Sequence, residues 1–398
     1  MTTTKVPALL AALIGGALVA APQTGAAQPL PALAIDLDRT TVSGLSSGAY
    51  MAGQFHLAFS AQIVGAGIVA GGPYGCAEGR LELALNRCMA TELGPPDPAA
   101  LLELARARAA AGGIDDLANL ADDRVYVFSG SADHTVLPAV AATVPAFYAA
   151  AGVPATALRL EAGLVAGHGF ATMDGPVACD ATGPPFVNDC DLDQAGEILG
   201  FLAGPVQPPA ATVPAPAAFD QAVYLADPEP RGLAATGRVY VPAACAAGAT
   251  CRVHIVFHGC QQAEAEVGDA VTVGAGYNRW AETNHVVLLY PQAAATWSNP
   301  KGCWDWWGYT GQRYPTRDGV QLAAVHRMLL ALAGQDDGTR PACTRHQDWY
   351  WNHWTQGRAV PCAWGLCAAG SGTPLGLWFG QATVIEQPPG FYATGACP

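Results

Sequence analysis

The sequence predicts an α/β fold, in which helices cover a mostly parallel central sheet whose strand order is circularly permuted along the chain. Apolar strand-like segments alternate with helical segments from Thr41 onward, which is typical of such a sheet. A G-x-S-x-G turn at Gly44–Gly48 lies close to the start of the chain, and an H-G turn at His258-Gly259 follows it. In α/β-hydrolases the H-G type of turn comes first in the chain. The pentapeptide is therefore either a chance match or the sign of a permuted fold.

The alternation divides the chain into two incomplete halves. The first half has the G-x-S-x-G turn without an H-G turn, and the second half has the reverse. A Pro- and Ala-rich segment, residues 204–218, separates them. Its composition alone is typical of an interdomain linker. In a permuted fold, however, it is the seam, that is, the segment that joins the C-terminus and the N-terminus of the unpermuted fold. Strands are expected at residues 40–44, 63–70, 124–129, 157–161, 222–225, 237–241, 253–258 and 286–290, and helices at 49–60, 99–111 and 319–333.

Both ends of the chain differ from this central part. Residues 1–27 contain Lys5, an apolar run and the small residues Gly25-Ala26-Ala27, which is the pattern of a signal peptide cleaved after Ala27. Residues 28–334 are expected to form the catalytic domain. Residues 335–398 contain their own cysteines and a run of four aromatic residues within six positions, and we expect a small C-terminal module there.

The composition excludes several classes of partner and indicates export. The 398 residues are 51% hydrophobic and carry a net charge of −13 without any run of Lys or Arg, which argues against nucleic acid and anionic membranes. Twelve cysteines in an exported chain indicate disulfides, and the absence of a Cys-x-x-Cys motif argues against a metal site. The expected pairs are Cys76–Cys88, Cys179–Cys190, Cys245–Cys251, Cys260–Cys303, Cys362–Cys367 and Cys343–Cys397.

Three polar residues follow strand ends in the order that serine hydrolases of this fold use. Ser46 lies at the centre of the G-x-S-x-G turn, where flanking glycines permit a strained strand-to-helix turn. Asp133 follows the strand at 124–129, and His168 lies in a Gly-flanked loop after the next strand. This order predicts nucleophile, acid and base. His134 competes with His168 as the base, but it adjoins Asp133 and would point away from it.

Two further groups complete the predicted site. An oxyanion hole needs two backbone N–H groups, and we expect them from Ser47 and Cys260. Trp304, Trp306 and Trp307 are too close together in the chain to point inward together, so we expect an apolar substrate wall. An ordinary Gly/Ser turn, a loop-capping Asp133, a surface His168 and a tryptophan core are the structural alternatives.

With these residues identified, residues 41–333 resemble the extracellular short-chain-length polyhydroxyalkanoate depolymerases. The resemblance rests on Gly-Leu-Ser46-Ser-Gly-Ala-Tyr-Met, His258-Gly-Cys-Gln-Gln, Gly276-Tyr-Asn-Arg-Trp and Gly302-Cys-Trp-Asp-Trp-Trp-Gly-Tyr. It matches the subtype whose serine box lies near the N-terminus. It implies a circularly permuted α/β-hydrolase that hydrolyses poly(3-hydroxybutyrate) esters, with the same nucleophile, acid, base, oxyanion donors and Trp loop. Many secreted relatives carry a larger polymer-binding domain than the short tail found here.

The expected function is therefore that of a secreted or periplasmic serine esterase acting on poly(3-hydroxybutyrate) or its oligomers. It needs no cofactor and no metal, and its partner is the polyester. One alternative is a feruloyl or related aryl esterase, because such enzymes share these signatures. A second is a secreted polymer- or glycan-binding protein without turnover, although this leaves the ordered Ser, Asp and His residues unexplained.

Overall fold

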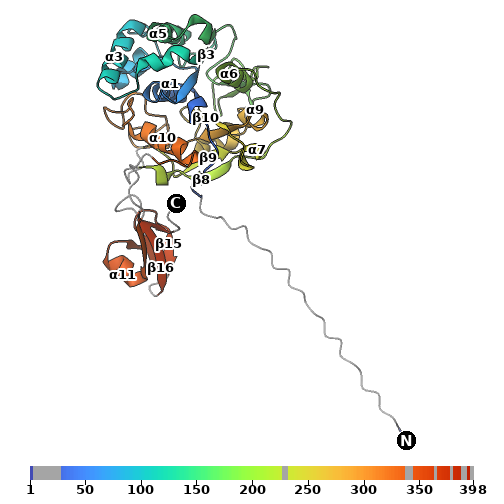
Figure 1. Cartoon of the computed structure of the whole chain (residues 1–398), viewed down its shortest axis with the longest axis vertical. Helices are drawn as coiled ribbons and strands as arrows, with labels where there is room; N and C mark the ends of the chain where they lie inside the picture. Colours follow the sequence, from blue (N-terminus) through green and yellow to red (C-terminus); the bar gives the residue numbers. More distant parts are fainter. Residues whose placement is uncertain are drawn as a thin grey trace.

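The structure is a computed structural model that describes residues 1–2, 28–225, 232–336, 344–362, 365–376, 380–386 and 392–394. Within these residues the main sheet has eight strands in the order β4-β3-β2-β1-β10-β11-β9-β8 (Figure 1). The strands from β4 to β11 are parallel; at one edge β9 pairs antiparallel with β11, and β8 pairs antiparallel with β9. Their bounds are β1 Thr40–Leu45, β2 Ile63–Val69, β3 Arg124–Phe128, β4 Leu158–Glu161, β8 Ala217–Asp220, β9 Thr236–Tyr240, β10 Arg252–Phe257 and β11 Val286–Tyr290.

Helices cover both faces of this sheet because its strands are apolar on both sides. Val125 and Val127 of β3 belong to one hydrophobic core, whereas Tyr126 and Phe128 belong to the other. Such continuous apolar runs are typical of parallel strands buried on both faces. The first core includes residues of α1 Ser47–Ala58, α3 Pro98–Ala110, α5 Thr143–Ala151 and α10 Val320–Leu332, and the second includes residues of α6 Gln194–Ala203 and α9 Tyr277–Asn284 (Figure 1).

The strand order confirms the permuted fold. The halves meet where β1 pairs with β10, and β4 and β8 are the outermost strands at opposite edges. The Pro-rich segment leads from one edge to the other along α9, where Ala210 donates its amide to the carbonyl of Arg279. The amide of Leu33, ahead of β1, donates to the carbonyl of Leu332 at the end of α10, at 2.7 Å. In an unpermuted chain, the end of α10 near Leu332 would continue directly into the segment that leads to β1 near Leu33.

One predicted strand is wrong. Residues 222–225 contain a 3₁₀-helix, Ala222–Tyr224, and the edge strand β8 lies just before them. The carboxylate of Asp220 accepts the amide of Ala222, which turns the chain out of the sheet. The remaining main-sheet strands and the three predicted helices are present with ends shifted by at most a few residues. Further short elements are α2 Leu81–Asn86, α4 Pro138–Ala141, α7 Ala243–Ala246, α8 Glu264–Val267, β5 Phe170–Thr172, β6 Val177–Ala178 and β7 Val187–Asp189.

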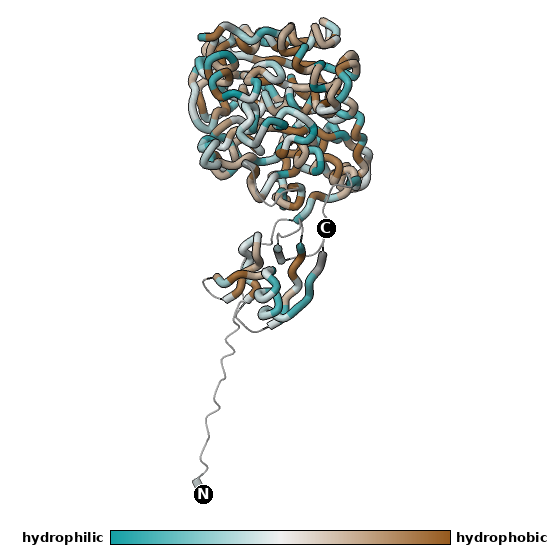
Figure 2. Tube along the Cα trace, turned by 90° about the vertical axis from the view of Figure 1, so that its left-hand side faces the viewer, coloured by the Kyte–Doolittle hydropathy of each residue, from teal (hydrophilic) through white to brown (hydrophobic). Residues whose placement is uncertain are grey.

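A second, smaller body follows α10 (Figures 1 and 2). It holds two three-stranded sheets, β12-β16-β17 and β13-β14-β15. The side chains of Trp349 and Trp351 are more than half exposed. Its elements are β12 Thr344–Trp349, α11 Tyr350–Thr355, β13 Ala359–Cys362, β14 Gly365–Ala368, β15 Pro374–Gly376, β16 Gln381–Glu386 and β17 Tyr392–Thr394. The division of the chain into a catalytic domain at residues 28–334 and a C-terminal module at residues 335–398 stays a prediction.

Five of the six predicted disulfides are present, namely Cys76–Cys88, Cys179–Cys190, Cys245–Cys251, Cys260–Cys303 and Cys362–Cys367. The sixth pair, Cys343–Cys397, lies outside the described residues, as does the signal peptide apart from Met1 and Thr2. Over the part of the chain that the structure describes, no helix is both long and apolar enough to cross a membrane.

Candidate active site

Ser46 lies on the predicted sharp turn between β1 and α1. Its backbone has φ 57° and ψ −119°, a region that residues other than glycine rarely adopt. The amide of Ser46 donates to the carbonyl of Val69 at 2.9 Å, which ties the turn to the next strand. The side chain is nearly buried but lines a cavity. The strained strand–turn–helix context that a nucleophilic serine requires is therefore present.

The flanking glycines are needed because backbones approach closely here. A Cβ atom on Gly44 would overlap the carbonyl oxygen of Gly48, and one on Gly48 would overlap the carbonyl oxygen of Phe257. Phe257 ends β10, and its Cα pairs in register with that of Gly44. The serine turn thus packs directly against the residues that lead into His258-Gly259, despite their separation in sequence.

Asp133 and His168 form a buried pair at the carboxyl ends of β3 and β4. The Nδ1 atom of His168 lies 2.8 Å from Oδ2 of Asp133, and the other carboxylate oxygen accepts the amides of Thr135 and Val136. An ionised carboxylate only accepts hydrogen bonds, so Nδ1 carries the proton and Nε2 is left as a base. The competing His134 is exposed and does not line the cavity.

The loop that carries His168 is held by residues that the sequence did not reveal. The amide of His168 donates to Oγ1 of Thr182 at 2.8 Å. Asn188 of β7 is buried, and its amide group donates to the carbonyls of Ala178, Cys179 and Ala181. These bonds, together with the Cys179–Cys190 disulfide, close the loop around His168. No motif marks Asn188, because its partners are backbone carbonyls.

The H-G turn has its own supports. Gly259 donates its amide to Oε1 of Gln262, whose amide group donates to the carbonyls of Pro185 and Phe186. The Nε2 atom of His258 accepts the amide of Ala293, so Nδ1 donates to the carbonyl of Gly259. Burial lowers the pKa of His258 to about 4, which keeps it neutral in this role. Gln262 lies in the His-Gly-Cys-Gln-Gln motif, so a signal for it was available.

The amides of Ser47 and Cys260, the predicted oxyanion donors, both lie beside this turn. Ser47 opens α1, where the first amides have no partner within the helix. Among the described residues, neither amide has a backbone or side-chain acceptor. The Cys260–Cys303 disulfide fixes the position of Cys260, and both cysteines line the cavity.

The three tryptophans of the following loop have different environments. Asp305 accepts the amides of Trp307, Gly308 and Tyr309 and thereby folds the loop. Burial raises the pKa of this carboxyl group, which the hydrogen bonds oppose. Trp306 and Trp307 line the cavity, and Trp306 stacks on Tyr50 with ring centroids 4.1 Å apart.

Trp304 does not fit the expectation of a substrate wall. It is fully buried, packs edge-on against Phe257 and is not among the lining residues. The loop is irregular and carries no strand at these residues, and Trp304 packs into the core beside Phe257 of β10.

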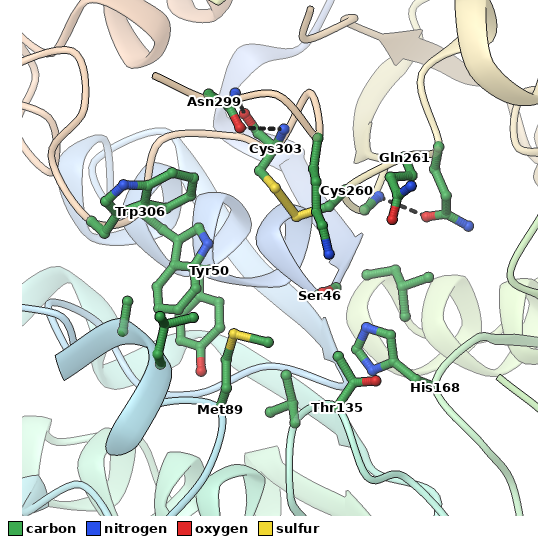
Figure 3. A pocket seen from close by; sticks show the side chains of 18 of the residues that line it. Ser46, Tyr50, Met89, Thr135, His168, Cys260, Gln261, Asn299, Cys303 and Trp306 are labelled. Atoms are coloured by element: carbon green, nitrogen blue, oxygen red, sulfur yellow. Dashed lines mark hydrogen bonds between the residues drawn. A yellow bond between two sulfur atoms is a disulfide. The ribbon is translucent and has the colours of Figure 1, made fainter. Parts of the chain in front are cut away.

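These residues meet around a cavity of about 480 Å3. Figure 3 shows Ser46 and His168 facing the same space below the Cys260–Cys303 disulfide. Tyr50 and Trp306 lie on the side of this space opposite His168. The volume is in the range of small-molecule sites. The apolar part of the wall is formed by Leu45, Leu81, Ala84, Leu85, Met89, Val136 and Phe186 together with the aromatic residues. Within the described ranges no group of three or more His, Cys, Asp or Glu side chains is arranged to hold a metal ion.

The sheet order, the strained serine turn and the adjoining H-G turn define a circularly permuted α/β-hydrolase fold. No protein-family model matches the chain. The chain is 42% identical over 322 residues to a poly(3-hydroxybutyrate) depolymerase of Delftia acidovorans, covering 79% of this chain and 64% of that protein. It is 35% identical over 324 residues to a polyhydroxybutyrate depolymerase of Talaromyces funiculosus, covering 75% of this chain and 91% of that protein.

Solved structures agree. A PHB depolymerase from Penicillium funiculosum matches with a TM-score of 0.71 at 31% identity, over 77% of this chain and 99% of that one. A serine-to-alanine PHB depolymerase complexed with an R3HB trimer matches with the same TM-score at 30% identity and equal coverage. The chain belongs to the poly(3-hydroxybutyrate) depolymerase family. It spans less than two thirds of the length of its Delftia relative.

Proposed function

We propose that this protein hydrolyses the ester bonds of poly(3-hydroxybutyrate) or its oligomers through an acyl-enzyme on Ser46. The observation that carries the proposal is the single cavity that holds Ser46, His168 paired with Asp133, and two amides without acceptors among the described residues. The solved relative that is complexed with an R3HB trimer supports the substrate class. The five disulfides support a site of action outside the cytoplasm.

In the proposed reaction, Oγ of Ser46 attacks the ester carbonyl carbon while Nε2 of His168 takes its proton. The amides of Ser47 and Cys260 stabilise the negative oxygen, and losing one such donor typically costs about 10²–10³ in rate. The ester C–O bond then breaks, and His168 returns the proton to the leaving alkoxide. Water, activated by the same His168, releases the hydroxyacyl group as a carboxylic acid. Trp306, Trp307 and the aliphatic wall exclude bulk water from these steps.

The test replaces Ser46 with alanine. We expect Ser46→Ala to lose turnover of 3-hydroxybutyrate oligomers and of p-nitrophenyl butyrate by at least about 10³-fold, while Ser371→Ala, an exposed serine of the small body, retains it. Near wild-type activity of Ser46→Ala would contradict the proposal. Faster turnover of methyl ferulate than of the oligomers would identify an aryl esterase instead. Binding of polymer without turnover, and without fluorophosphonate labelling of Ser46, would identify a binding protein.

A further inference from the structure

We propose that Lys301 recognises the free carboxylate end of a hydroxyalkanoate oligomer in the active-site cavity. This inference rests on the proposed function and adds a specificity-determining residue to it. Lys301 lines the cavity, and its side chain is exposed there. The only other lysine of the sequence is Lys5.

The charge of the lining makes Lys301 distinctive. Apart from His168, it is the only Lys, Arg, His, Asp or Glu residue among the described residues that line the cavity. Among the described residues no carboxylate forms an ion pair with it, although Arg80, Arg87, Arg106, Arg159, Arg238, Arg313, Arg317 and Arg358 all pair with acidic side chains. In a chain with a net charge of −13, this leaves one uncompensated positive charge at the rim of an otherwise neutral and largely apolar site.

Hydrogen bonds and a disulfide hold the backbone around Lys301 beside the H-G turn. Its carbonyl accepts the amide of Gln261 at 2.8 Å, and Gln261 directly follows Cys260. Two residues later, Cys303 forms the disulfide to Cys260. Asn299 closes the loop from the other side, since its side chain donates to the carbonyl and accepts the amide of Cys303. The ammonium group therefore extends from a fixed point close to the reacting centre.

The chemistry of the substrate indicates what this charge recognises. The ester groups of a polyhydroxyalkanoate are neutral, and a linear oligomer carries one formal charge, the carboxylate at the end opposite its free hydroxyl. That carboxylate belongs to the fragment that leaves as the alcohol when the ester is cleaved. A carboxylate held at Lys301 would therefore direct cleavage to the ester bonds near the carboxylate end. The same charge would offset the repulsion that the acidic protein exerts on anionic oligomers.

The experiment compares the trimer of 3-hydroxybutyrate as the free acid with its methyl ester. Mass spectrometry counts only cleavage between hydroxybutyrate units. For the wild-type protein we expect kcat/KM to be about fivefold higher for the acid at low salt, as for a partly exposed ion pair. The preference should shrink toward one between about 0.02 M and about 0.5 M salt, because exposed charges are screened.

Variants assign the preference to the ammonium group. Lys301→Met should abolish the acid preference, and Lys301→Arg should retain it. The matched control is Arg313→Gln, which removes an exposed cation outside the cavity lining and should keep the wild-type ratio. A wild-type ratio near one, or an unchanged ratio in a folded Lys301→Met protein, would overturn the inference. If Lys301→Met does not fold, the salt dependence of the wild-type acid-to-ester ratio of kcat/KM is the test. A ratio that does not fall with salt would then overturn the inference. If the wild type cleaves neither oligomer, the proposed function itself fails.

Discussion

The Nε2 atom of His56 lies 2.9 Å from Oδ2 of Asp123, in a buried pair at the amino ends of the sheet strands. The pair of His168 and Asp133 at the carboxyl ends has nearly the same nitrogen–oxygen distance, 2.8 Å, although His168 contacts its carboxylate through Nδ1. Nδ1 of His56 is 3.1 Å from the hydroxyl group of Tyr148 in the core, whereas His168 faces the cavity. The distance within each pair therefore does not distinguish the two sites. What distinguishes them is that His168 lines the cavity and His56 does not.

This duplication provides a matched pair of variants. We expect Asp133→Asn to reduce kcat by about 10⁴-fold, because the amide no longer holds His168 in the tautomer that accepts the serine proton. Asp123→Asn should lower the free energy of unfolding by about 1–3 kcal/mol, as for a damaged buried hydrogen bond. The folded Asp123→Asn protein should nevertheless keep kcat. Rates on p-nitrophenyl butyrate and urea unfolding measure both effects, and an equal loss of kcat in the two variants would refute the assignment.

A second matched pair lies on helix α1. Gly48→Ala would push a methyl group into the carbonyl oxygen of Phe257, whereas the nearest atom to a Cβ on Gly53 is Cδ1 of Ile68 at 3.7 Å. We expect Gly48→Ala to lower the free energy of unfolding by about 3 kcal/mol and to reduce kcat by displacing the H-G turn. Gly53→Ala should raise stability by about 0.5–1 kcal/mol, because alanine favours the helix. Denaturant midpoints give the comparison; tolerance of Gly48→Ala would contradict the close packing.

The positions of Ser46, Asp133 and His168 were predictable because each directly follows a strand or lies in the loop after one, and parallel strands bring their carboxyl ends together. The permutation was predictable from the order of Ser46 and His258 alone. In contrast, the burial of Trp304 was not. The direction of one side chain in an irregular loop depends on the bonds made by Asp305, which no periodicity records.

Other omissions have different causes. Helix α6 carried a readable signal, since Asp193 caps its start by accepting the amide of Gly196 and its apolar residues Ile198, Leu199 and Leu202 have helical spacing. The role of Asn188 had no such signal. Its three acceptors are backbone carbonyls of a loop that is irregular in sequence, so only the folded chain brings them together.

Two buried histidines predict acid sensitivity. His254 lies within hydrogen-bond distance of Thr41 and Ser43, both at 2.8 Å, and burial lowers its pKa to about 3; burial lowers that of His258 to about 4. Because both values lie below the usual 6.5, the unfolded chain binds more protons between these limits. Their contribution to stability is complete above pH 6.5 and falls as the pH drops toward 4, by up to about 1.4 kcal/mol per pH unit for each histidine.

Urea unfolding between pH 7 and pH 4.5 tests this slope. We expect His254→Gln to flatten it, because one titrating group is lost, while His134→Gln, which changes an exposed histidine, should leave it unchanged. Histidine NMR titration of the wild type provides an independent measurement. A neutral-to-charged transition of His254 near pH 6.5 in the folded protein would contradict the prediction.

The contact between Leu33 and Leu332 predicts that the permutation is reversible. A protein that starts near Pro214, continues to Gly334, and then passes through a short Gly-Ser linker to Leu30 and on to Gly204 keeps every strand pairing of the main sheet. Chain ends that lie close together tolerate such rearrangement. We expect cooperative unfolding and p-nitrophenyl butyrate turnover close to that of residues 28–334 in their natural order.

The control opens the chain between His254 and Ile255 inside β10, where both neighbours are buried strands, and should not fold. Failure of the first protein with correct disulfides would show that the seam does more than connect the two edges.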